Sequence, residues 1–276
     1  MSGKFRLIIA AAIAFFAIAS YYGKSSLNPI TGEKQRVSLS PEQEIAMGMQ
    51  TAPQMAAQFG GLSSDAQARA LVKKVGNRLV AQSVAVRSPY KYDFHLLADS
   101  RTINAFALPG GQIFITEGLL KLLRTEGELA AVLGHEIGHV IARHSAEHLA
   151  KQALTQGLVG AAVVGSGDMT TAQIAQQVGA VINMKYGRDD EIESDGLGIR
   201  LAAEAGYDPR AMIRVMQALA KASSGARQPE MLSTHPNPEN RVGKIKAEIE
   251  KQFPSGVPEG LVASAPNRAR RIASFA

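Results

Sequence analysis

Cysteine is absent from the 276-residue sequence. Its absence excludes disulfide bonds, zinc sites built on thiolates and the lipid attachment that lipoproteins carry on a cysteine. It is compatible with an oxidising compartment but does not require one. Basic clusters interleaved with aromatic residues are missing as well, so the formal charge of +6 does not indicate DNA or RNA binding. That charge could instead favour anionic membrane surfaces.

A long hydrophobic run is also missing at the N-terminus. Residues 7–19 are thirteen unbroken apolar residues, whereas a membrane-spanning helix needs about 20. Lys4 and Arg6 precede the run, and Ala17-Ile18-Ala19 ends it with the small-x-small pattern of a cleavage site. Residues 1–22 are therefore expected to be a cleaved secretory signal, with a short uncleaved anchor as the alternative. Either one places the rest of the chain in the periplasm or cell envelope.

The remaining sequence divides at changes in composition. Residues 23–40 are polar and rich in turn formers, which predicts a linker. Residues 41–253 are expected to form one domain, a size that a single packed core can support. Residues 254–276 are rich in Pro, Ser and Ala and carry Arg268, Arg270 and Arg271, which predicts a flexible basic tail.

Within the domain, local patterns predict helices first and strands after them. Helices are expected at 41–59 and 64–82, separated by Gly60-Gly61. From residue 92 apolar and polar residues alternate, which predicts strands at 92–97, 103–108 and 112–116. Pro109-Gly110-Gly111 would join the last two strands as a hairpin. An edge strand here could bind an extended peptide by β-augmentation, although an ordinary core hairpin would have the same residues.

The motif that organises the chain is GHEIGHVIARH, within the helical run 129–148. His135, Glu136 and His139 have the H-E-x-x-H spacing, and the sequence has only six histidines. Residues four apart share one face of a helix, so both imidazoles can bind one Zn²⁺ while Glu136 reaches a water beside it. Glycines at 134 and 138 would let another backbone approach closely. The alternative is a helix with two histidines that bind no metal.

A third ligand is expected in the acidic segment 188–200, RDDEIESDGLGIR. On a helix Glu191 and Asp195 share a face, whereas Glu193 points the opposite way. One of the pair can bind the metal while the other accepts a hydrogen bond from a ligand imidazole. The segment could otherwise be an exposed first helical turn, where acids suit the macrodipole. Gly196 and Gly198 favour close packing instead.

The segment between these two motifs predicts a helical hairpin. Residues 151–167 and 170–186 are rich in Ala, Val, Gly and Gln, with a turn at Ser166-Gly167-Asp168. The apolar part, 157–165, is too short to cross a membrane by itself. The hairpin could be a lid over the site or a packing layer.

These motifs together resemble the gluzincin metallopeptidases of the HtpX and CAAX prenyl protease type. HEIGH, EIESD and STHPNPENRV carry the resemblance, and the subgroup most similar is that of the BepA/LoiP-type periplasmic and mitochondrial Oma-type proteases. The resemblance covers residues 28–246. It implies zinc bound by His135, His139 and Glu191, with Glu136 as the catalytic residue. Ser194 stands where the family usually has alanine, and the several transmembrane helices of HtpX are absent, so prenyl-peptide processing is not expected.

Two residues near the C-terminus are further candidates. His235 lies in a proline-rich segment, THPNP, whose rigidity suits a fixed loop. It could approach the open metal position, bond the oxyanion, cap the metal as a fourth ligand, or only hold the next helix. Arg241 is a candidate for stabilising developing negative charge.

The sequence therefore predicts an α+β fold, a mostly helical zincin-type domain with a small, mainly antiparallel sheet beside the HExxH helix. One Zn²⁺ per chain would serve an endopeptidase that hydrolyses unfolded or misassembled envelope proteins bound as extended strands. A membrane surface is a possible partner and nucleic acid is not. The alternatives are a metal-binding envelope chaperone with little proteolysis, and a scaffold that needs no metal. Glu136 favours the enzyme, because a structural zinc site needs no general base.

Overall fold

A computed structural model of the chain describes residues 3–166, 186–223, 229–235 and 240–262. Contacts divide the chain into two compact units. Unit 1 comprises Met1–Ser40 and Arg143–Met184, and unit 2 comprises Pro41–Ala142 and Lys185–Ala276. The α+β class is confirmed, since helices dominate both units and the strands form two small sheets.

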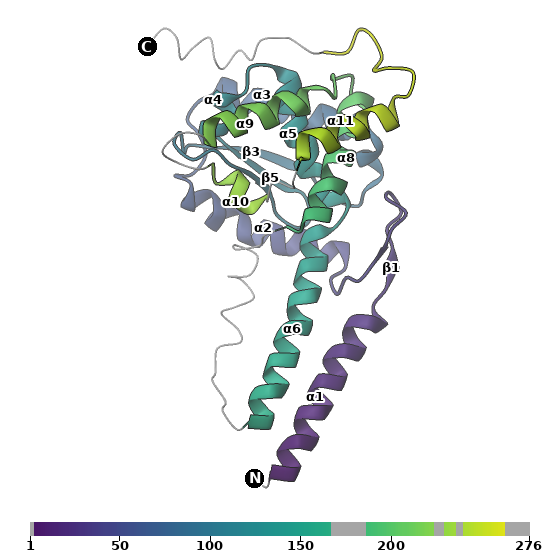
Figure 1. Cartoon of the computed structure of the whole chain (residues 1–276). Coiled ribbons are helices and arrows are strands. Elements are labelled where there is room, and N and C mark those ends of the chain that lie inside the picture. The colour runs from purple at the N-terminus through teal and green to yellow at the C-terminus, as the bar shows by residue number, and fades with distance from the viewer. Residues whose placement is uncertain (1–2, 167–185, 224–228, 236–239, 263–276) are drawn as a thin grey trace. The chain divides into compact units, whose positions relative to one another are not determined.

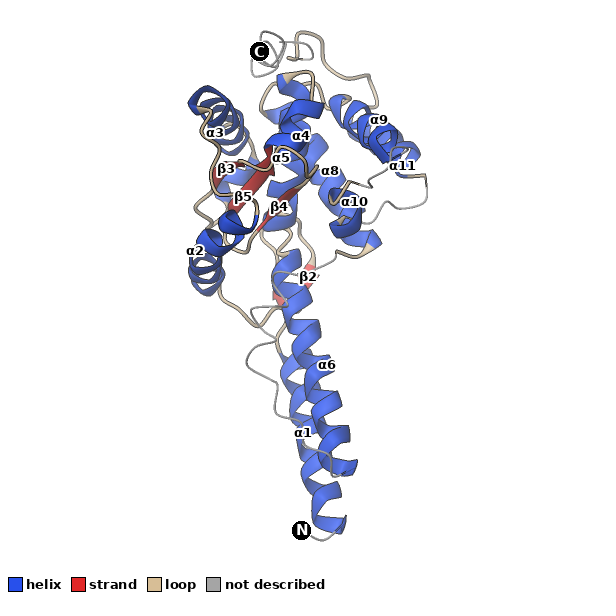
Figure 2. Cartoon of the chain, turned by 90° about the vertical axis from the view of Figure 1, so that its left-hand side faces the viewer, coloured by secondary structure: helices blue, strands red, loops and turns tan. Residues whose placement is uncertain are grey.

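Unit 1 is built on two long helices that run side by side in opposite directions, α1 (Gly3–Gly23) and α6 (His144–Ser166) (Figures 1 and 2). The predicted linker contains a short antiparallel pair, β1 (Ser26–Leu27) with β2 (Lys34–Gln35). Helix α1 is long and apolar enough to cross a membrane. The apolar run 7–19 alone is too short to span a bilayer, but the residues on both sides of it continue the helix.

The sheet of unit 2 has three strands in the order β3-β5-β4. Strand β3 (Asp93–Leu97) pairs in parallel with β5 (Gln112–Thr116), and β4 (Ala105–Ala107) pairs with β5 in the opposite sense. One pairing of this sheet is thus parallel and the other antiparallel, so the prediction of a mainly antiparallel sheet beside the HExxH helix is wrong. The predicted hairpin is confirmed, and Gly110 and Gly111 supply its positive φ angles of 80° and 106°.

Two helices begin unit 2 as predicted, α2 (Pro41–Gln58) and α3 (Ala66–Ala81). Asp65 caps α3 by accepting a hydrogen bond from the amide of Ala68 at 2.9 Å. Helix α3 packs against β3, and its Gly76 leaves no room for a Cβ beneath the ring of Phe94. After β5 come the short α4 (Glu117–Leu122) and then α5 (Glu126–Ile141).

Helix α5 is the centre of unit 2. Every residue from Gly127 to Ile141 is buried, because the sheet, α3, α8 (Arg188–Glu204) and α9 (Ala211–Ser223) all pack against it (Figure 2). Helix α11 (Arg241–Gln252) packs against α8 and α9. A helix buried on all sides is normally apolar all round. The polar residues of α5 therefore require partners in the interior.

The predicted helix boundaries after the HExxH motif are wrong. The helical run expected to reach residue 148 ends at Ile141, because Arg143 adopts a left-handed φ of 58° and a new helix, α6, begins at His144. The first arm of the predicted 151–167 and 170–186 hairpin is thus part of a longer helix, and the second arm lies outside the described residues up to 185. Within the predicted tail, 254–276, the amide of Val262 donates to Gly206 O at 2.9 Å, and the flexible tail stays a prediction. The three tail arginines lie outside the described residues.

Candidate metal centre

Close packing of α5 against α8 brings the two motifs together. A Cβ on Gly134 would lie 3.2 Å from the carbonyl oxygen of Gly198, and one on Gly138 would lie 3.0 Å from that of Ser194. A Cβ on Gly198 would in turn lie 3.0 Å from the amide nitrogen of His135. The prediction that these glycines allow close backbone approach is confirmed. Gly196 is different, since its nearest neighbour would be an ordinary contact at 3.6 Å.

We expect Gly138→Ala to loosen this packing. The added methyl group would press against the Ser194 carbonyl, which is backbone and cannot rotate away. Overpacking of this kind costs about 1–3 kcal/mol, so the melting temperature should fall and metal should bind more weakly. Gly196→Ala on α8 is the control, because its methyl group would make only ordinary contacts, and it should change the melting temperature and metal binding little. Gly157→Ala on α6 cannot serve as a control, because its methyl group would also be crowded. Equal melting temperatures for Gly138→Ala and Gly196→Ala would contradict the argument.

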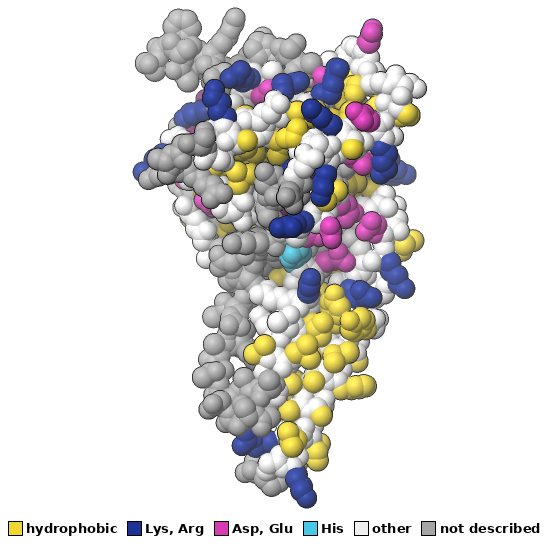
Figure 3. Space-filling view, in the orientation of Figure 1, with side chains coloured by type: hydrophobic (Ala, Val, Ile, Leu, Met, Phe, Trp, Pro, Cys, Tyr) yellow, Lys and Arg dark blue, Asp and Glu magenta, His cyan; other side chains and the backbone are white. Residues whose placement is uncertain are grey.

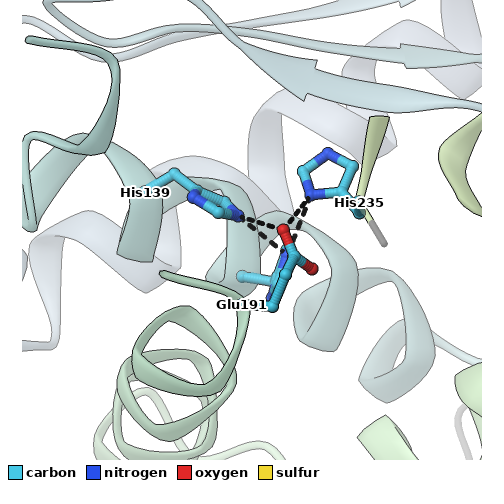
Figure 4. A group of neighbouring side chains, drawn as sticks. His139, Glu191 and His235 are labelled. Carbon is cyan, nitrogen blue, oxygen red and sulfur yellow. Dashed lines mark hydrogen bonds and ion pairs between the residues drawn. The ribbon is translucent and has the colours of Figure 1, made fainter. Parts of the chain in front are cut away.

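Four buried side chains converge between α5, α8 and the short helix α10 (Met231–Thr234). They are His135, His139, Glu191 and His235, and one potential ligand atom from each lies within 4.8 Å of all the others. Figure 4 shows His139 and His235 both pointing at the Glu191 carboxylate. His139 Nε2 is 3.4 Å from Glu191 Oε1, and His235 Nδ1 is 3.0 Å from the same oxygen.

The spacing of these atoms fits a tetrahedral metal. Ligands about 2.0–2.1 Å from a zinc ion are roughly 3.3 Å from one another. His135 Nε2 lies 3.0 Å from His139 Nε2 and 3.3 Å from His235 Nδ1. Together with the two distances to Glu191 Oε1, four edges of such a tetrahedron are close to this length. The three imidazoles and one carboxylate are also a donor set that suits zinc.

Charge in the site fits a divalent cation. Three carboxylates, Glu136, Glu191 and Asp195, are buried beside a single buried guanidinium, that of Arg241. With neutral imidazoles and ionised carboxylates the sum is three negative charges against one positive, or −2. Uncompensated charge in a protein interior is costly. With the imidazoles neutral, as metal binding requires, the described residues thus leave a deficit that one divalent ion would neutralise.

Asp195 and Arg241 form the layer behind the ligands. Asp195 Oδ1 lies 3.0 Å from His135 Nδ1, the ring nitrogen that faces away from the cluster. Arg241 donates from Nε to Asp195 Oδ2 and from Nη2 to Oδ1, both at 2.8 Å, and its Nη1 lies 2.9 Å from Glu191 Oε2. Because the whole guanidinium fork faces these two carboxylates, this geometry fits a positioning residue better than the predicted stabiliser of developing charge.

Glu136 has an unusual environment. Both carboxylate oxygens are buried and accept no hydrogen bond from any described residue. The nearest cationic partner is His235, whose Nε2 is 3.6 Å from Glu136 Oε1. Burial is the main cause that raises the pKa of Glu136, with help from the charge of Glu191 and against the pull of His235, His135 and Arg241. A carboxylate with a raised pKa is suited to accept a proton near neutral pH.

For Glu191 and His235 the surroundings favour the charged form of the side chain. Burial by itself raises the pKa of Glu191, but the charge of His235 and hydrogen bonds from His139 and His235 outweigh it, so that pKa lies well below its usual range. Burial lowers the pKa of His235, but Glu136 and Glu191 outweigh it and raise the net value. In the absence of metal, Glu191 therefore stays ionised and His235 favours the protonated form.

Sequence reasoning missed Tyr186. Its ring stacks on the His139 imidazole with centroids 3.8 Å apart and an interplanar angle of 20°, and its amide donates to Thr234 O at 3.4 Å. Tyr186 thus covers one ligand and contacts the helix that carries another. Only its position two residues before the acidic segment 188–200 could have drawn attention to it. Glu193, expected on the opposite face from Glu191, is half-buried and outside the cluster.

The edge strand β4 lies near the segment that bears His235. The amide of Met231 donates to Ile103 O at 3.1 Å, and Asn104 Nδ2 donates to Glu230 Oε1 at 3.2 Å. Helix α10 is therefore tied to the chain just before β4. This arrangement connects an edge of the sheet with His235, for which capping the metal was one of several predicted roles.

Comparison with known proteins agrees with this geometry. The sequence pattern of peptidase family M48 matches residues 66–249, which contain all eight site residues described above. The chain belongs to peptidase family M48. The resemblance seen in the sequence motifs is thereby confirmed.

Curated relatives come from bacteria and mitochondria. The chain is 34% identical over 238 residues to the beta-barrel assembly-enhancing protease of Yersinia pestis, covering 83% of this chain and 48% of that protein. For the protein of the same name in Escherichia coli K12 the identity is 28%, covering 82% and 48%. The mitochondrial metalloendopeptidase OMA1 of Schizosaccharomyces pombe is 30% identical, covering 88% and 72%. The chain thus spans about half the length of the bacterial relatives.

Proposed function

We propose that this protein is a zinc-dependent endopeptidase that hydrolyses unfolded or misassembled proteins of the cell envelope. The observation that carries the proposal is the buried cluster of His135, His139, Glu191 and His235 with the unpartnered carboxylate of Glu136 beside it. A structural metal site has no use for a buried base without hydrogen bonds, which costs stability. A hydrolase has a use for such a base, because an incoming water molecule can donate the missing hydrogen bond.

The metal would be held by His135, His139 and Glu191. A zinc ion bound there supplies Lewis acidity, polarising the peptide carbonyl and lowering the pKa of a water molecule. Asp195 Oδ1 lies 3.0 Å from His135 Nδ1 and favours a proton on that nitrogen, so that Nε2 carries the lone pair that faces the cluster. Arg241 holds the carboxylates of Asp195 and Glu191 in place.

Glu136 acts as the general base and then as the general acid. It takes a proton from the attacking water and passes it to the amine that leaves, so the peptide bond breaks as the new carbon–oxygen bond forms. The apolar interior around α5 raises its pKa, which brings the carboxylate nearer to the working pH. Its carboxylate needs no rearrangement of other hydrogen bonds before it accepts that proton.

His235 is proposed to close the site in a resting form. A catalytic zinc site keeps one position open for water or substrate, but His235 Nδ1 lies at the fourth corner of this cluster. The ties between α10 and the residues before β4 suggest how a peptide could release it. A peptide that adds to the edge of the sheet would compete for the Ile103 carbonyl and weaken the hold on α10.

His235→Ala should therefore increase peptide cleavage. If the closed arrangement holds about nine molecules in ten, its removal raises the rate roughly tenfold, while His135, His139 and Glu191 still retain the metal. Thr234→Ala, one residue earlier on α10, serves as the control and should leave the rate unchanged. A rate that falls tenfold or more in His235→Ala, with metal retained, would show that His235 assists the reaction instead.

The substrate class rests on the relatives' names and on the N-terminal helix. Two relatives are named for beta-barrel assembly, a process of envelope proteins, and a third is a mitochondrial metalloendopeptidase. Helix α1 is consistent with a signal or an anchor that directs the chain to the envelope. An extended binding mode would favour unfolded segments, since folded substrates cannot offer a free strand.

The test is metal analysis of the purified full chain combined with cleavage of casein. We expect about one zinc per chain, loss of cleavage on chelation, and recovery when zinc is restored. Metal binding without cleavage by either wild type or His235→Ala would favour a metal-binding chaperone, which should then suppress aggregation of an unfolded protein. A chain that binds no metal would overturn the proposal.

A further inference from the structure

The surface of α1 in unit 1 is unusual for a protein in water. Phe5, Phe15 and Phe16 are 53%, 74% and 75% exposed, and the yellow side chains that follow α1 in Figure 3 form a continuous apolar surface. Leu158 and Val159 of α6 are exposed as well. Contiguous exposed apolar surfaces usually mark an interaction site.

Packing between α1 and α6 is inverted relative to a soluble helix pair. The half-buried side of α1 is rich in alanine, with Ala10, Ala14 and Ala17 beside Ile9 and Ile13, and a Cβ on Gly157 would lie 2.6 Å from the Cβ of Ala17. The phenylalanines face outward instead. Membrane helices associate in this way, because lipid covers the large side chains and small residues let the backbones approach.

The dimensions and flanks of α1 match a bilayer. Its 21 residues extend about 31 Å at 1.5 Å per residue, close to the roughly 30 Å of a hydrocarbon core. Lys4 lies at one end and Tyr21 and Tyr22 at the other, as is typical of helices anchored at both interfaces. The sequence has no acidic residue before Glu33.

The apolar end of α6 lies beside the apolar part of α1. Arg6 Nε donates to Val164 O at 3.3 Å, and Gly157 contacts Ala17, so these pairs fix the antiparallel register. A bilayer that surrounds α1 would therefore also surround α6 from Gly157 to Val164. The sequence is compatible with this environment, since Asp168 is its only charged residue between Lys151 and Lys185.

We propose that unit 1 inserts into a lipid bilayer as a helical pair, in which α1 is retained as a spanning anchor and the apolar end of α6 lies in the hydrocarbon beside it. Helix α6, which follows the HExxH motif, is then a membrane element, not a lid. The proposal concerns unit 1 only and holds whether or not unit 2 cleaves peptides. The partner is the bilayer, and lipid covers the outward-facing side chains of both helices.

The absence of cysteine makes a clean test possible. Val159→Cys places a single thiol on the exposed face of α6, and Val86→Cys, 62% exposed on the 3₁₀ turn Val84–Arg87 of unit 2, is the matched control. Each full-length variant is reacted with a maleimide in membranes opened by freezing and thawing. Because a thiol in hydrocarbon does not ionise, Val159→Cys should react at least about tenfold more slowly than Val86→Cys. The two rates should become equal in denaturing detergent.

Two further measurements address the anchor and its neighbour. The intact mass of the membrane-bound chain should include residues 1–22. Ala17→Cys should remain monomeric on oxidation, because α6 covers that position. Any one of three results would overturn the proposal. They are equal labelling of Val159→Cys and Val86→Cys in membranes, a mass that lacks the N-terminal segment, and a disulfide dimer through position 17.

Discussion

Glu136→Gln should lower the rate of peptide cleavage by about 10³-fold, within the range that general bases contribute, and leave the metal content unchanged. Glutamine has nearly the shape of glutamate but cannot accept the proton of the attacking water. The metal is retained because Glu136 is not among the four clustered ligands. Casein cleavage and metal analysis on the same purified sample measure both properties.

The same substitution should make the protein more stable. In the wild type both oxygens of Glu136 are buried and accept no hydrogen bond within the described chain. Replacing a buried charge by a neutral amide removes part of that cost, on the order of 1 kcal/mol. A variant that is less active but melts at a higher temperature is the signature of a residue kept for catalysis.

Glu193→Gln provides the matched control for this experiment. It removes the same charge from the nearby helix α8, but the side chain is half-buried and outside the cluster. Activity and stability should both stay close to wild type. If the two variants were equally active, Glu136 would not be the base, and the enzymatic proposal would lose its main support.

The sequence was sufficient to single out the candidate ligands on helices, because helical periodicity is a local property. His135 and His139 are four residues apart, as are Glu191 and Asp195, and regular helices place each pair on one face. The glycines at 134, 138 and 198 also indicated that two backbones would come close. The chemistry of zinc indicated that these would be the backbones of the HExxH helix and of the acidic segment 188–200, because zinc needs a third protein ligand.

Features that depend on long-range contacts were beyond such reasoning. Tyr186 stacks on a histidine 47 positions away, and no local pattern predicts that pairing. Arg241 was singled out, but its role depends on the distances to Asp195 and Glu191, which only the fold provides. The end of α5 was missed for a different reason. Arg143 adopts a positive φ, and no glycine or proline at that position indicates a break in the helix.

Arg241→Met should destabilise the metal-free protein by about 3–5 kcal/mol, the usual consequence of leaving buried charges without their partner. The guanidinium contacts Asp195 and Glu191 through three nitrogen atoms at 2.8–2.9 Å, and all three residues are buried. Methionine fills a similar volume and provides no charge. Both carboxylates would then lose their permanent cation and keep only imidazole neighbours in the interior, and thermal unfolding after chelation measures the loss.

Metal should restore part of this stability. A divalent ion at the cluster compensates Glu191 directly, whereas Asp195 is separated from the cluster by His135. The difference in melting temperature between wild type and Arg241→Met should therefore be smaller with zinc than without it. Arg241→Lys keeps one charge but cannot fork to two carboxylates, so its stability should lie between the two.

Arg200→Met is the control for the loss of a cation from this region. Arg200 pairs with Glu204 at 2.8 Å on the same helix α8 as both carboxylates, but the pair is exposed. Exposed pairs of this kind contribute about 0.3–0.5 kcal/mol, so the variant should unfold close to wild type. If Arg241→Met were no less stable than Arg200→Met without metal, Asp195 and Glu191 would not depend on Arg241. The charge count that implies a divalent ion would then have to be revised, because at least one of those carboxylates would be neutral in the metal-free protein.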